Sequence, residues 1–149
     1  MIGDLLKRLA GDYTPEPLPA DQARLALAAL MVRIGRTDGD YTAAERSRID
    51  RVLAETYRLS PEAATALRRD GETAEADAPD TVRFTRVIKD AVPYEHRTEI
   101  VEALWRVAAA DGINADEHGL MRLVANLLGV SDQDSGLARQ RALRSLGES

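Results

Sequence analysis

The sequence predicts an all-α fold, a pseudo-symmetric helical bundle of two three-helix repeats with one helix before them and one between them. The segment at residues 28–39 recurs in similar form at residues 100–112. Apolar residues follow a three- and four-residue spacing along most of the chain, and no segment alternates long enough for a strand. A chain of 149 residues suits one compact core, so we expect a single domain over residues 1–149.

The residue pattern in the first part of the chain predicts a short helix and then repeat one, which spans about residues 21–71. Apolar residues at helical spacing predict an amphipathic helix over residues 2–10, which breaks at a glycine and three nearby prolines. The first helix of the repeat should end at the turn containing Gly39, because glycine permits a left-handed backbone. The second and third helices should begin at Thr42 and Ser60, whose hydroxyls suit helix caps.

The second part of the chain predicts a connecting helix and repeat two, over about residues 95–145. The stretch Gly71–Pro79 is polar and acidic, and we expect a loop there. Asp80 should open a helix that runs through Ile88. Trp105 lies among apolar residues and is expected in the core. The helices of the second repeat are expected near residues 95–110, 115–128 and 132–145.

The two repeats are related by nearly constant offsets. A fixed internal period of this kind is typical of a duplicated unit. The offsets are 73 positions between Asp38 and Asp111, 72 between Thr42 and Asn114, and 71 between Ser60 and Ser131.

Composition limits the classes of function. The 20 Lys and Arg residues against 25 Asp and Glu residues give a net charge of −5, which argues against a nucleic-acid partner and favours cations or basic partners. The chain has no cysteine, so disulfide and thiolate chemistry are excluded. No secretory segment and no apolar run of about 20 residues is present. We therefore expect a cytoplasmic protein, and these features do not favour membrane contact.

Several enzyme chemistries lack their motifs. The glycine-rich loops that cradle phosphates and the serine turn of hydrolases are absent, and His96 and His118 have no zinc-ligand spacing. His118 follows Asp116 and Glu117, but successive helical residues point about 100° apart and cannot converge on one ion. The sequence therefore predicts a non-enzymatic protein.

Two acidic turns remain as the candidate site. The first begins at Asp38 and reaches Glu45, and its carboxylates and nearby carbonyls could ligate a divalent cation, although the spacing is not that of an EF-hand. The pairs Thr42 with Glu45 and Asn114 with Glu117 also fit capping boxes, which stabilise helix starts without any metal. Capping accounts for more of this pattern than metal binding does, and both interpretations stay open here.

The duplicated helix, Asp-Gly turn and capped helix resemble the TerB-like family, named for bacterial tellurite-resistance proteins. The likeness covers about residues 21–145 and is most specific at 105–112 and 123–131. It implies an all-helical bundle whose two turns approach each other and bind a divalent metal such as Ca²⁺, Mg²⁺, Mn²⁺ or Zn²⁺. The ligands implied are Asp38, Asp40, Glu45, Asp111 and Glu117.

Two functions of different class follow. The first is a metal-binding module in a stress or tellurite-resistance context. The alternative is a metal-free scaffold for protein partners, whose identity the sequence does not name.

The helix at residues 2–10 would pack on the bundle or support a homodimer. Basic residues of the third helices form either a solvated helix end or a docking face for an acidic partner or lipid headgroups: Arg68, Arg69, Arg139, Arg141 and Arg144.

Overall fold

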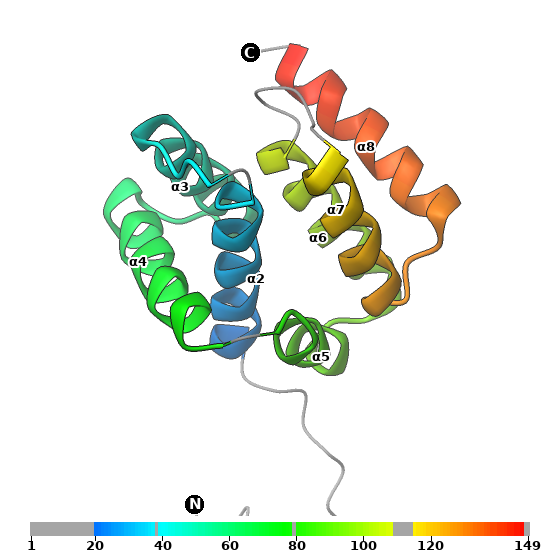
Figure 1. Ribbon diagram of the computed structural model, residues 1–149, viewed down its shortest axis with the longest axis horizontal. Coiled ribbons are helices and arrows are strands. Elements are labelled where there is room, and N and C mark those ends of the chain that lie inside the picture. The colour runs from blue at the N-terminus through cyan, green and yellow to red at the C-terminus, as the bar shows by residue number, and fades with distance from the viewer. Residues whose placement is uncertain (1–19, 38, 79, 109–114, 148–149) are drawn as a thin grey trace, which may run out of the picture.

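The computed structural model of the chain describes residues 20–37, 39–78, 80–108 and 115–147 (Figure 1). Within these ranges the chain forms helices and no strand, which confirms the all-α prediction. None of the helices described there has both the length and the apolar composition to cross a membrane. The helix predicted over residues 2–10 lies outside the described ranges. The helices are α2 (Ala20–Gly35), α3 (Ala43–Tyr57), α4 (Pro61–Asp77), α5 (Val82–Ala91), α6 (Tyr94–Ala108), α7 (Ala115–Leu127) and α8 (Asp132–Gly147).

Helix α2 is the centre of the molecule. In Figure 1 it stands between α3 and α4 on one side and α6, α7 and α8 on the other, and it packs against α3, α4, α5, α6 and α7. Every side chain from Ala26 to Val32 is at most 3% exposed. A helix that is apolar around its whole circumference can only be stable when other elements surround it. The remaining helices are therefore arranged around α2.

Helix α6 has the corresponding role in the second half of the chain. It packs on α8 and α7, and α8 in turn packs on α6 and α7. Trp105 of α6 is 4% exposed, which confirms the prediction that it lies in the core. Its indole N–H donates to the Ser135 hydroxyl of α8 at 3.1 Å, so the buried polar atom of the ring is satisfied.

The connections α3–α4 and α7–α8 share one local geometry. Arg58 and Gly129 both adopt a left-handed backbone, with φ of 54° and 75°. Ser60 and Ser131 then accept a hydrogen bond from the backbone N–H three residues later, each at 3.1 Å. These pairs stand at the same offset in the sequence repeat. The local geometry recurs at these positions, and the pseudo-symmetry of the whole units stays a prediction.

The loop predicted from Gly71 is wrong, because α4 continues through this residue to Asp77. Gly71 is buried against α2, and a Cβ atom at this position would lie 2.8 Å from both the carbonyl carbon and the Cβ of Ala28. The glycine therefore permits two helix backbones to approach closely and does not end the helix.

Arg33 of α2 holds the end of α4. Its Nη2 donates to the carbonyl oxygen of Ala78 at 2.5 Å, and its Nη1 donates to the Thr81 hydroxyl at 3.2 Å. Its Nε donates to the Glu75 carboxylate at 3.4 Å. The last carbonyl groups of a helix have no partner within the helix. Arg33 supplies one from α2 and at the same time ties α4 to the start of α5.

We predict that Gly71→Ala destabilises the protein, although alanine favours a helix by about 1 kcal/mol over glycine. The added methyl group would press on the backbone of Ala28, and overpacking of this kind costs about 1–3 kcal/mol. The free energy of unfolding in urea measures the effect. Gly119→Ala in α7 is the control, since a Cβ there meets no atom within 4 Å and the change should be neutral or stabilising. A Gly71→Ala variant as stable as the wild type would contradict the constraint.

Candidate functional site

The structure describes three of the five predicted metal ligands. Asp40 is exposed after α2, Glu45 is half-buried in the first turn of α3, and Glu117 is half-buried in the first turn of α7. Asp38 and Asp111 lie outside the described residues. Helices α2 and α6 end, and α7 begins, at the same end of the bundle, drawn at the top of Figure 1. This end is called the acidic end below.

The capping box predicted at the start of α3 is present. The backbone N–H of Glu45 donates to the Thr42 hydroxyl at 3.1 Å, and the Thr42 N–H donates to Oε1 of Glu45 at 3.5 Å. Arg46 donates to the carbonyl oxygen of Tyr41 at 2.8 Å. One carboxylate oxygen of Glu45 and one carbonyl of the turn thus already have protein partners. Asn114, the corresponding residue of the second turn, lies outside the described residues.

A polar network anchors the first turn to α4. The Tyr41 hydroxyl donates to the Glu72 carboxylate at 2.6 Å, and Nη1 of Arg68 donates to the same oxygen at 2.9 Å. Nε of Arg68 donates to Asp50 of α3 at 2.6 Å. Arg68 is 9% exposed, so the prediction that it belongs to a basic surface is wrong. Its guanidinium is held inside because two carboxylates neutralise it there.

The same network shifts three pKa values. Burial alone would raise the pKa of Glu72, but the hydrogen bonds from Tyr41 and Arg68, with the charges of Arg68 and Arg36, hold it below its ordinary value of 4.5. Burial and the hydrogen bond to Glu72 raise the pKa of Tyr41. Burial alone would lower the pKa of Arg68, and its contacts with Asp50 and Glu72 raise it instead. Glu72 is therefore held as a carboxylate and Arg68 as a cation.

The other residues of the predicted basic face differ in their surroundings. Nε of Arg141 donates to Glu102 of α6 at 2.6 Å, so part of its charge is neutralised within the bundle. Arg139 lies with its guanidinium carbon 5.3 Å from the centre of the Trp105 ring. Arg69 and Arg144 are exposed. The docking face therefore stays a prediction for a smaller set of residues than the sequence indicated.

The described residues alone do not complete a metal site. Across residues 20–37, 39–78, 80–108 and 115–147, no three acidic or histidine side chains are grouped so that they could hold an ion. Two of the five predicted ligands lie outside those ranges, so the metal site stays a prediction. The donors proposed for it are all carboxylates, which suit a hard divalent cation.

Sequence reasoning missed the surroundings of His118. Its ring meets that of Trp105 edge to face, with the ring centres 5.8 Å apart, at the wall of a cavity between α6, α7 and α8. The two residues belong to different helices. No spacing within one helix could have indicated the contact. The only signal in the sequence was Trp105 itself, the single tryptophan of the chain, which was predicted to lie in the core.

Comparison with known proteins identifies one family. The family model described as "Tellurite resistance protein TerB" matches residues 24–140, most of the chain, and this confirms the resemblance found in the sequence. No curated protein and no solved structure matches the chain.

We predict that Glu72→Gln weakens the acid dependence of stability. The pKa of Glu72 is lowered in the folded state, so its stabilising contribution is present above its unfolded pKa and is lost as the pH falls through the folded value. The variant should be less stable at pH 7 by about 1–3 kcal/mol and lose less stability below pH 4.5. Urea unfolding between pH 7 and pH 3 measures both effects.

Asp70→Asn is the control for this prediction, because Asp70 is an exposed carboxylate on the same helix. It should keep the wild-type stability at pH 7 and the wild-type response to acid. Equal acid dependence in the wild type and in Glu72→Gln would show that the contacts of Glu72 do not stabilise the fold.

Proposed function

The chain belongs to the TerB family, and we propose that it is a non-enzymatic cytoplasmic module that binds a divalent cation in a tellurite-resistance or stress context. The ion would bind at the acidic end, where the α2–α3 and α6–α7 connections contribute carboxylates. The ligands proposed are Asp38, Asp40, Glu45, Asp111 and Glu117.

The arrangement of the helix ends is the observation that supports this proposal. Helices α2 and α6 both direct their carboxyl termini to the acidic end, where α7 also begins (Figure 1). The carboxyl end of a helix carries partial negative charge and favours cations. The starts of α3 and α7 carry the opposite partial charge, which the half-buried carboxylates of Glu45 and Glu117 offset. An all-oxygen donor set favours Ca²⁺, Mg²⁺ or Mn²⁺ over Zn²⁺, which prefers nitrogen and sulfur ligands.

A bound ion would link the two halves of the molecule. Asp40 lies in the α2–α3 connection, Glu45 in the first turn of α3 and Glu117 in the first turn of α7. An ion that drew ligands from both connections would fix the setting of α3 relative to α7. Binding would then be transmitted through helices that pack on the central α2. This would suit a metal-responsive module.

A metal-free scaffold for protein partners is the second candidate. It is favoured by three leucines on α7 and α8 that are large, apolar and nearly half exposed. Exposed apolar side chains mark a partner site where they form one contiguous patch, whereas single ones are normal on a protein surface. The three leucines are Leu123 at 48%, Leu137 at 45% and Leu143 at 45% exposure.

Calorimetric titration of chelator-treated protein with Ca²⁺, Mg²⁺, Mn²⁺ and Zn²⁺ tests the metal proposal. We expect saturable binding by the wild type and a loss of at least tenfold in affinity in both Asp38→Ala and Asp111→Ala. Asp77→Ala is the control, since Asp77 is an exposed carboxylate at the far end of α4 and should leave binding unchanged. Circular dichroism would establish that each variant is folded.

The outcomes separate the two candidates. Loss of binding in both variants supports one site shared by the two turns, and a saturating ion should then raise the stability of the wild type by about 2.7 kcal/mol at a hundredfold excess over the Kd. Absence of binding in the wild type would overturn the metal proposal. The carboxylates would then act as helix caps, and the scaffold would be the function to pursue.

A further inference from the structure

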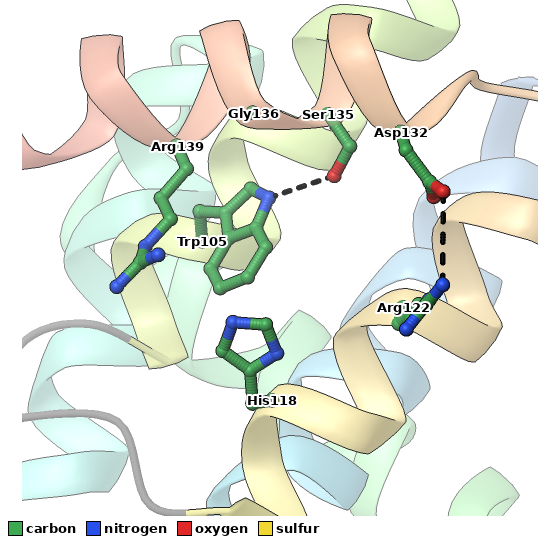
Figure 2. Close-up of a pocket in the computed structure, with 7 residues that line it drawn as sticks. All are labelled: Trp105, His118, Arg122, Asp132, Ser135, Gly136 and Arg139. Carbon is green, nitrogen blue, oxygen red and sulfur yellow. Dashed lines mark hydrogen bonds and ion pairs between the residues drawn. The ribbon is translucent and has the colours of Figure 1, made fainter.

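A cavity of about 270 Å³ lies between α6, α7 and α8, and Figure 2 shows the side chains that line it. It is separate from the residues of the proposed metal site. Three helices contribute to its wall: Trp105 comes from α6, His118 and Arg122 come from α7, and Asp132, Ser135, Gly136 and Arg139 come from α8.

Trp105 forms a rigid wall of the cavity. Its ring is fixed from α8 by the hydrogen bond to Ser135 at 3.1 Å and by the guanidinium of Arg139, 5.3 Å from the ring centre. From α7 it is held by His118, whose ring lies at 72° to the indole (Figure 2). Ser135 accepts the bond from Trp105 and keeps its own hydroxyl proton to donate. The wall thus combines a fixed aromatic edge with a hydrogen-bond donor.

The cavity wall has an excess of positive charge, because the guanidinium groups of Arg122 and Arg139 face a single lining carboxylate, that of Asp132. Within the part of the chain that the structure describes, Arg139 forms no ion pair, and its buried Nε has no hydrogen-bond partner. His118 forms no hydrogen bond to a described residue. Nη2 of Arg122 lies 3.9 Å from Oδ2 of Asp132, and the two side chains are 70% and 69% exposed. Such an exposed pair is weak and leaves Arg122 available to a ligand.

This local charge is opposite to that of the whole chain, whose net charge is −5. Guanidinium groups bind carboxylates and phosphates in paired hydrogen bonds, and the edge of an aromatic wall contacts flat apolar groups. The cavity volume limits the ligand to a small molecule. A small anion with a flat apolar portion therefore matches the positive charge, the aromatic wall and the volume of the cavity.

We propose that this cavity binds a small organic anion, in which a carboxylate or phosphate group lies beside a planar apolar portion. Arg139 and Arg122 hold the anionic group, His118 and Ser135 supply further hydrogen bonds, and Trp105 contacts the apolar portion.

Gly136 offers a way to close the cavity without disturbing the fold. It lies inside α8, where glycine is less favourable than other residues, and a Cβ there would meet no atom within 4 Å. Gly136→Leu therefore favours the helix and fills space at the cavity wall. Gly119→Leu is the matched control, since Gly119 is also helical and also open, but does not line the cavity.

Trp105 is the sole tryptophan, so its fluorescence reports on the cavity directly. We expect phenyl phosphate to change this emission saturably, with excitation at 295 nm chosen to avoid the probe, and calorimetry to give the same Kd. Inorganic phosphate should bind at least tenfold more weakly, and neutral phenol should not bind. Gly136→Leu and Arg139→Gln should each lose at least tenfold in affinity. Gly119→Leu and Arg144→Gln, whose residues lie outside the cavity wall, should stay within twofold of the wild type.

The results that overturn the proposal are distinct. Absence of a saturable signal in the wild type removes the site. Phenol binding as tightly as phenyl phosphate would make the cavity a neutral apolar site, and inorganic phosphate binding equally well would make it a site for inorganic oxyanions. Equal loss in the control variants would place binding elsewhere. None of these results depends on the metal titration, so this proposal and the proposed function stand or fall separately.

Discussion

The burial of α2 on every side is the constraint on which the rest of the structure depends. Helices from both halves of the chain pack on it, and its segment Ala26–Val32 is almost completely inaccessible to solvent. Small residues in this segment let neighbours approach closely, most clearly where Gly71 of α4 meets Ala28. Once α2 is surrounded, the polar ends of its neighbours must be satisfied where they meet it. Arg33 does this for α4, which explains why a charged residue belongs to the most buried helix.

The sequence was sufficient for the fold class, because helical spacing and capping residues are local signals. Thr42 and Ser60 cap the helices that they were predicted to cap. Gly71 and Arg68 were misjudged for one shared reason. A glycine that permits close packing and an arginine that is neutralised inside the bundle depend on residues of other helices, Ala28 for the first and Asp50 for the second. No pattern along the chain contains those partners.

The candidate site was predictable only in part. Sequence spacing identified the capping box at Glu45, and the structure contains it. Whether the two acidic turns act together depends on tertiary distances, which a repeat implies but does not determine. The cavity beside Trp105 was missed because its wall comes from three helices. The net charge of the whole chain is negative, so composition gave no indication that arginines gather at this cavity.

The first turn of α7 connects the two proposed sites. Glu117 and His118 are consecutive, and successive positions on a helix point about 100° apart. The turn therefore presents a carboxylate to one environment and an imidazole to another, and His118 contacts Trp105. With Glu117 in the proposed metal site and His118 in the proposed anion site, Asp116, Glu117 and His118 would not act as one cluster of ligands. Under the two proposals, a ligand at either site would restrain the same helical turn, and any coupling between their affinities would be reciprocal.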